Sequence, residues 1–259
     1  MRIVVLVKYV PDIEIGYEFT PELRLDRTGD GLLSELDEHP LEEARRLAEE
    51  LGAEVVALTV GPDEADEALR RALQMGADRA VHVVDDAIAG SDVSATALIL
   101  ARAVERLGGA DLILTGVESA DAGTGLLPVQ LAARLQIPAL TGAASLAIVE
   151  GRAVVRKVED AATLTLAAPL PALVAVGEGA NQPAYPSAKA VMLARRKPVD
   201  ELSLDDLGLD GGEVGACASH LEVRDVAAAP VRVGGRTVDG ATAEAMDAFI
   251  DLLRQNNLI

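Results

Sequence analysis

The chain has 259 residues, half of them hydrophobic and only 2% aromatic, so its core must consist of aliphatic side chains, as in helices packed on a parallel sheet. A net charge of −19 excludes the basic surface of a nucleic-acid-binding protein. The single cysteine, Cys217, allows no disulfide within the chain and no zinc site built from thiolates, and it fits a cytoplasmic protein.

Strands and helices alternate four times along the first half of the chain. Buried parallel strands are predicted at residues 2–7, 54–60, 77–84 and 111–115. The first predicted helix opens at Pro40 and closes at Gly52, and the second ends at Gly76. The third is capped by Ser91 or Asp92, and the fourth covers residues 127–136. This alternation predicts a doubly wound, mostly parallel α/β sheet.

The pattern changes after Pro138. Short strands separated by turns at residues 150–151 and 159–160 predict a hairpin added to the sheet, and residues 172–176 predict a last buried strand. We therefore expect a nucleotide-binding α/β domain over residues 1–197. Residues 198–259 are expected to form an extended arm that ends in an amphipathic helix, which packs on a partner chain or on the chain's own core.

No apolar run approaches the ~20 residues that cross a membrane. The first residues also lack the cleavage site of a signal peptide. We therefore expect no direct membrane insertion.

A glycine-rich loop follows the fourth strand, in the stretch DLILTGVESADAGTGLLPVQLAARL. Gly116, Gly123 and Gly125 would let the backbone approach a ligand, and the next helix adds the positive end of its dipole. The pattern GxxxxGK[ST] is absent, and Pro128 interrupts a GxGxxG match. Asp121 would repel a phosphate unless it serves a ribose hydroxyl or orders the loop. The loop therefore predicts either a nucleotide phosphate site or an ordinary glycine-rich connection.

Catalytic motifs are not found. His39, His82 and His220 lie far apart, and neither GxSxG nor HExxH occurs. We therefore expect a protein without catalytic residues of its own.

Several segments, in the same order, resemble the beta subunit of electron transfer flavoprotein, in the form found in actinobacterial members. They are IVVLVKYVPD, LDEHPLEEARRL, RRALQMGADRAVHV, GVESADAGTG and NQPAYPSAKAVMLARRKP. The resemblance implies a Rossmann-like fold of the adenine nucleotide alpha hydrolase type.

The resemblance also implies a function. A beta subunit of this family pairs with an alpha subunit; the heterodimer carries one FAD, held mainly by alpha, and one structural AMP in beta. FAD receives electrons from acyl-CoA dehydrogenases or other flavin dehydrogenases and passes them to a quinone oxidoreductase.

Site residues carried over by position fall in two groups. Leu6, Ser34 and Val60 would line the adenosine. The AMP phosphate and ribose would be wrapped by Gly116, Val117, Glu118, Ser119, Ala120, Asp121, Ala122, Gly123, Thr124, Gly125, Leu126 and Leu127.

This chain departs from the family pattern at the nucleotide. Ser34 stands where many members have Asn, and residues 125–128 replace the Gln and Thr of the family's loop. Backbone N–H groups and Thr124 must then carry the phosphate. Electron-bifurcating members bind a second FAD here and usually show Gly-Asp-Thr-Ala-Gln, which this chain lacks, so the sequence favours AMP.

The dehydrogenase-docking segment also departs. Ala188, followed by Lys189, stands where the family projects an apolar anchor, often Leu, and this change forfeits ~2 kcal/mol of apolar burial. The basic residues Arg195, Arg196 and Lys197 either steer an acidic partner or form a solvated loop.

Two rival functions remain open. One is a stand-alone adenine-nucleotide-binding module of the stress-response type. The other is a nucleotide-dependent ligase, which should have a Ser-Gly-Gly-x-Asp-Ser-like loop after the first strand. Residues 8–12 read KYVPD instead, which disfavours the ligase.

Overall fold

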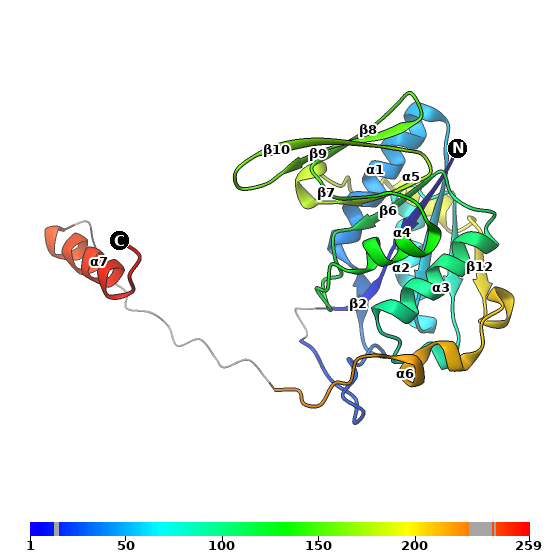
Figure 1. The fold of residues 1–259 in the computed structure, drawn as a ribbon, viewed down its shortest axis with the longest axis horizontal. Helices are drawn as coiled ribbons and strands as arrows, with labels where there is room; N and C mark the ends of the chain where they lie inside the picture. The colour runs from blue at the N-terminus through cyan, green and yellow to red at the C-terminus, as the bar shows by residue number, and fades with distance from the viewer. Residues whose placement is uncertain (13–15, 228–239, 241) are drawn as a thin grey trace. The chain divides into compact units, whose positions relative to one another are not determined.

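The computed structural model describes residues 1–12, 16–227, 240 and 242–259. Seven parallel strands form the central sheet, in the order β12-β5-β4-β1-β6-β11-β7. Their bounds are β1 Arg2–Leu6, β4 Glu54–Val60, β5 Arg79–Val83, β6 Leu112–Gly116, β7 Ala139–Ala143, β11 Ala172–Val176 and β12 Val199–Leu202. The fold of the chain can be followed in Figure 1. The predicted α/β fold with a mostly parallel sheet is confirmed.

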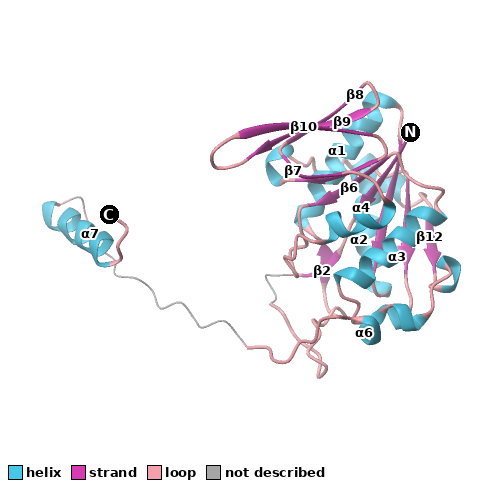
Figure 2. Ribbon diagram, in the orientation of Figure 1, coloured by secondary structure: helices cyan, strands magenta, loops and turns pink. Residues whose placement is uncertain are grey.

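Helices cover both faces of this sheet (Figure 2). On β1 the side chains alternate, so that Ile3 and Val5 join one core cluster while Val4 and Leu6 join the other. The first cluster packs against α1 Glu35–Leu51 and α2 Asp66–Met75, and the second packs against α3 Val93–Arg106 and α4 Leu127–Leu135. Both clusters are aliphatic, as the shortage of aromatic residues requires.

Helix α1 begins at Glu35, five residues before the predicted start at Pro40, so that prediction was wrong. Glu35, Asp37 and Glu38 lie in its first turn, where carboxylates interact favourably with the positive end of the helix dipole. Pro40 lies inside the helix; because it has no N–H, it cannot bond the carbonyl of Leu36. Gly52 ends the helix in the left-handed conformation, as expected.

The predicted hairpin gains a third strand. Strands β8 Ser145–Val149, β9 Arg152–Val158 and β10 Thr163–Pro169 form an antiparallel sheet of their own, and Leu146 and Val155 bury against the α1 side of the core. A short antiparallel pair, β2 Tyr9–Pro11 and β3 Gly31–Leu33, follows β1.

Part of the expected arm is packed instead of extended. Strand β12 pairs in parallel with β5 at the edge of the central sheet. After it, α6 Gly215–Ala218 follows a segment whose Leu204, Leu207 and Val214 are buried. The first compact unit therefore runs from Met1 to Arg224, and Asp225–Ile259 form a second unit.

The second unit contains α7 Ala243–Gln255, the predicted C-terminal helix. None of its residues is buried, and Met246, Phe249 and Leu252 are about half exposed or more. Helix α5 Ala188–Ala194, by contrast, belongs to the first unit and contacts α2.

Candidate functional site

The candidate site lies where the strand order changes direction. Strand β1 pairs with β4 on one side and with β6 on the other. Their connections leave in opposite directions from this point, and ligands of open parallel sheets bind at the carboxyl ends of the strands there. Lys8 follows the carboxyl end of β1, and residues 117–126 follow that of β6. The glycine-rich loop is thus at the position where such a fold receives a ligand.

Gly116 brings the loop against the first turn of α1. A Cβ at this position would lie 2.8 Å from Asp37 Oδ1 and 3.0 Å from the Leu36 carbonyl oxygen. A side chain at residue 116 would therefore displace the helix or the strand. Pro40 has no N–H to donate to the carbonyl of Leu36. This same carbonyl faces Gly116.

The later part of the loop presents backbone donors. Gly123 and Gly125 have φ values of +55° and +60°, which favour glycine. Residues 122–126 are exposed. Within the described chain, the N–H groups of Thr124, Gly125 and Leu126 donate to no protein acceptor. These free donors directly precede the amino end of α4, where an anion is stabilised.

Two cations from distant parts of the sequence meet at Asp121. Lys8 Nζ lies 2.8 Å from Asp121 Oδ1 and 3.2 Å from Ser119 Oγ, and Arg27 Nη2 pairs with Asp121 Oδ2. Although burial acts to raise it, the two cations lower the pKa of Asp121 to about 2. The loop has no lysine of its own, but the fold brings a lysine and an arginine to it.

Asp37 joins the ends of the two central strands. Its carboxylate accepts a 2.8 Å hydrogen bond from the backbone N–H of Lys8, and the N–H of Gly116 also bonds to it. Burial raises the pKa of Asp37 to about 7, against the opposing effect of these bonds and of Lys8.

Two buried hydroxyls near the end of β1 have no protein partner among the described residues. They are Ser34 Oγ and Thr59 Oγ1. The backbone N–H of Ser34 donates to the Lys8 carbonyl at 2.9 Å, but its side chain makes no capping bond to α1. A buried hydroxyl without a partner costs free energy unless water or a ligand supplies one. Both hydroxyls therefore fit a polar ligand at this edge.

The other predicted adenosine residues lie at the same edge of the sheet. Leu6 ends β1 and is buried, and Val60 ends β4 and is half-buried. The structure thus brings Leu6, Ser34, Val60 and residues 116–127 to the carboxyl edge of neighbouring strands. Sequence reasoning did not assign Lys8, Arg27, Asp37 or Thr59 to the site. Of these, Lys8 and Asp37 gave a signal, because they lie in the quoted segments IVVLVKYVPD and LDEHPLEEARRL.

The predicted docking residues form a separate group around α5. Ala188 and Lys189 are exposed at its start, where Ser187 caps the helix, and Arg195 and Arg196 are exposed after its end. Lys197 turns inward instead. Its Nζ donates to the carbonyls of Leu73 and Ala77, at 3.0 and 2.6 Å, beyond the carboxyl end of α2. Lys197 thus has a structural role that the sequence did not predict.

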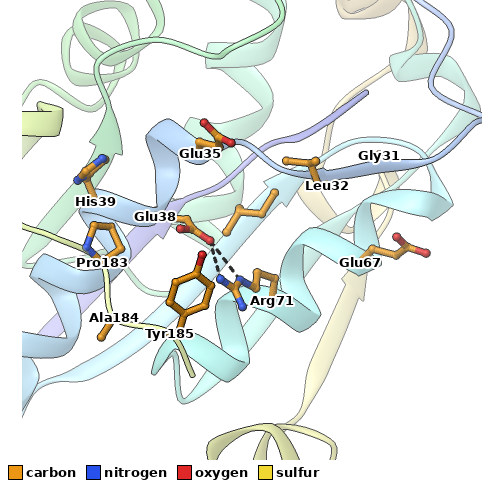
Figure 3. A pocket seen from close by; sticks show the side chains of 11 residues that line it. Gly31, Leu32, Glu35, Glu38, His39, Glu67, Arg71, Pro183, Ala184 and Tyr185 are labelled. Atoms are coloured by element: carbon orange, nitrogen blue, oxygen red, sulfur yellow. Dashed lines mark hydrogen bonds and ion pairs between the residues drawn. The ribbon is translucent and has the colours of Figure 1, made fainter. Parts of the chain in front are cut away.

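A cleft of about 570 Å³ lies beside the segment that leads into α5 (Figure 3). Residues of β3, α1, α2 and 183–185 line it, and Arg71 pairs with Glu38 inside it. Tyr185 is 93% exposed at its rim. Neither the loop 116–127 nor Lys8 lines this cleft.

No group of three or more His, Cys, Asp or Glu side chains in the described residues could hold a metal ion. His82 is buried and bonds the Gly61 carbonyl at 3.2 Å, whereas His39 bonds Asn181. In the same described part of the chain, no helix is long and apolar enough to cross a membrane.

Comparison with known proteins agrees with this geometry. Residues 22–207 match the model of the electron transfer flavoprotein domain. The chain is 38% identical over 244 residues to the electron transfer flavoprotein subunit beta of Mycobacterium tuberculosis, with 92% of each chain covered. It is 32% identical over 263 residues to the same subunit of Methylophilus methylotrophus, with 98% of each covered.

A third relative has a different name. Over 269 residues, and 100% of each chain, the protein is 31% identical to a subunit of the caffeyl-CoA reductase–Etf complex of Acetobacterium woodii. Both kinds of relative are thus matched over nearly their whole length.

Proposed function

Because the chain belongs to the electron transfer flavoprotein family, as a beta subunit, we propose that it is the AMP-binding half of a heterodimer whose alpha subunit holds FAD. The relatives of Mycobacterium tuberculosis and Methylophilus methylotrophus are subunits of electron transfer flavoproteins. The chain would therefore act as a carrier subunit, without catalytic residues of its own, in the cytoplasm.

The AMP proposal rests on the loop that follows β6, where the strand order of the sheet changes direction. The free N–H groups of Thr124, Gly125 and Leu126 would bind the phosphate, and the amino end of α4 would add its dipole. The orphaned hydroxyl of Ser34 and the ends of β1 and β4 at Leu6 and Val60 would receive the adenosine. The residues present therefore fit an adenine mononucleotide. Among the described residues around the loop, we identify no catalytic group that would react with it.

FAD supplies the electron chemistry when it is bound to the alpha subunit. The role of this chain is to bind that subunit and to position a donor near it. Helix α7, with Met246, Phe249 and Leu252 exposed, would pack on the alpha subunit. Ala188, Lys189, Arg195 and Arg196 would contact the dehydrogenase, such as an acyl-CoA dehydrogenase. The electrons would then pass to a quinone oxidoreductase.

A second candidate follows from the relative in the caffeyl-CoA reductase–Etf complex. In that case the chain would assemble with a reductase of CoA esters, and the loop would hold a second FAD in place of AMP. The sequence of the loop favours AMP, because the Gly-Asp-Thr-Ala-Gln of electron-bifurcating members is absent from it.

The test is to co-express the chain with the alpha-type subunit encoded nearest to it and to purify the complex. The nucleotides released on denaturation are then identified and counted. We expect FAD and AMP in equal amounts. Two FAD molecules per complex would support the second candidate. A nucleotide-loaded chain that never associates with alpha would instead identify a stand-alone nucleotide-binding module and overturn the carrier assignment.

A further inference from the structure

We propose that Lys8 and Arg27 fasten the loop 116–127 through Asp121 and thereby hold its backbone donors in the shape that receives a phosphate. The inference rests on the proposed nucleotide binding at this loop. It assigns a positioning role to Lys8 and Arg27, which lie outside the expected site, and makes Asp121 an anchor of the loop instead of a contact to the ligand. In the following, this Lys8–Asp121–Arg27 group is called the clamp.

The clamp is the main polar attachment of the loop. The Asp121 side chain is only 1% exposed, although its neighbours Ala120 and Ala122 are exposed. In the described chain, the hydrogen bonds and ion pairs that tie residues 117–126 to other segments pass through Lys8 or Arg27, apart from a 3.4 Å bond from the Tyr17 hydroxyl to the Ala120 carbonyl. Without the clamp, little but packing would hold the loop.

Lys8 and Arg27 each make further hydrogen bonds to the body of the fold. The backbone of Lys8 continues the central strand β1, donates to Asp37 at 2.8 Å and accepts from the Ser34 N–H at 2.9 Å. Arg27 Nη1 donates to the Tyr9 carbonyl at 3.0 Å. The loop is therefore fastened to the edge of the rigid sheet and to β2. Fixing a binding group in this way reduces the entropy that is lost when the ligand binds.

The clamp also explains how an acidic loop can receive an anion. Asp121 alone would repel a phosphate. With two cations against one carboxylate, the group carries one excess positive charge, and Asp121 is occupied by its partners.

Two readings of Asp121 make opposite predictions. If it acts only as a negative charge near the phosphate, its neutralisation should strengthen nucleotide binding. If it acts as the clamp, its neutralisation should loosen the loop and weaken binding. Glu178 offers a control, because it follows β11 at the same edge of the sheet, is an exposed carboxylate outside the loop, and makes no ion pair in the described chain.

The experiment compares Asp121→Asn with Glu178→Gln, each in the complex with the alpha subunit. Affinity for AMP is measured after the bound nucleotide has been removed. We expect Asp121→Asn to weaken AMP binding by about tenfold, the effect of losing one charge-assisted bond. Glu178→Gln should leave it within about twofold of the wild type. Lys8→Met and Arg27→Met, which each remove one cation, should weaken AMP binding in the same direction as Asp121→Asn.

A second measurement separates the clamp from the nucleotide assignment. Hydrogen–deuterium exchange of residues 117–126 is followed without added nucleotide, and we expect faster exchange in Asp121→Asn than in Glu178→Gln. If the wild type binds no AMP but this difference is present, the proposed ligand is wrong and the clamp stands. If exchange is equal in the two variants, or if Asp121→Asn binds AMP as tightly as the wild type, the clamp is refuted.

Discussion

Asp37 is the side chain at which the two central strands and the first helix meet. Its carboxylate is bonded by the N–H groups of Lys8 and Gly116, yet burial raises its pKa from the ordinary 3.8 to about 7. The folded protein therefore holds this proton more tightly than the unfolded chain does. By linkage, the stability connected with Asp37 is greatest below pH 4 and falls as the pH rises through 7.

We predict that Asp37→Asn flattens this dependence. Between pH 5 and pH 8 the free energy of unfolding of the wild type should fall, relative to the variant, by roughly 2–3 kcal/mol. Urea unfolding of both proteins at a series of pH values measures the difference. Glu35→Gln, an exposed carboxylate on the same helix, is the control and should follow the wild type. Parallel curves for wild type and Asp37→Asn would contradict the prediction.

The sequence predicted the place of the loop but not the residues that hold it. Residues 111–115 and the helix pattern after residue 127 were enough to place a glycine-rich loop at a strand's carboxyl end. Lys8 and Asp121 are 113 positions apart, and no local pattern reports such a contact. Thr59 was missed for a similar reason, because only the packed fold shows that its hydroxyl has no partner.

At the scale of elements, the carboxyl end of α2 depends on a residue far along the chain. The ammonium group of Lys197 bonds the carbonyls of Leu73 and Ala77, and burial lowers its pKa. A cation at this end of a helix satisfies free carbonyls and complements the dipole.

Lys197→Met should therefore lower the free energy of unfolding by about 1 kcal/mol. Arg196→Met removes the same charge from the neighbouring, exposed position and should leave stability unchanged. Thermal unfolding of the two variants provides the comparison. A role of Lys197 in docking alone would instead leave its melting temperature equal to that of Arg196→Met.

The strands of the central sheet that the sequence analysis missed are the short ones at its edges. β7 and β12 are the two edge strands of the central sheet, with five and four residues. β7 contains Thr141 and Gly142 and β12 contains Asp200 and Glu201, so neither shows the continuous apolar run of a central strand. The buried strands β1, β4, β6 and β11, which do show it, were all predicted.

At the scale of the whole molecule, the first unit has a core of its own. The buried residues of the described chain all lie at or before Gly215, whereas α7 has none. Met246 and Phe249 belong to the apolar face of α7, and in the proposed function this face packs on the alpha subunit.

We predict that a chain truncated after Arg224 melts within ~2 °C of the full-length chain, because the buried residues of the described chain all lie in the first unit. It should lose association with the alpha subunit. Calorimetry of the isolated chains and size-exclusion chromatography of the mixtures measure the two effects. Full association of the truncated chain would show that α7 is dispensable for pairing, and a large drop in melting temperature would show that it stabilises the first unit.

The pairing of β1 with β6 has a consequence during synthesis. Residues 3–5 align with residues 112–114. More than a hundred residues must therefore be synthesised after β1 before β6 can pair with its free edge. Until then an apolar strand edge is open to pairing with other chains. Nascent chains that stop before residue 112 should therefore be prone to aggregation. The proposed ligand site, built across this pair, cannot assemble before residues 116–127 have been synthesised.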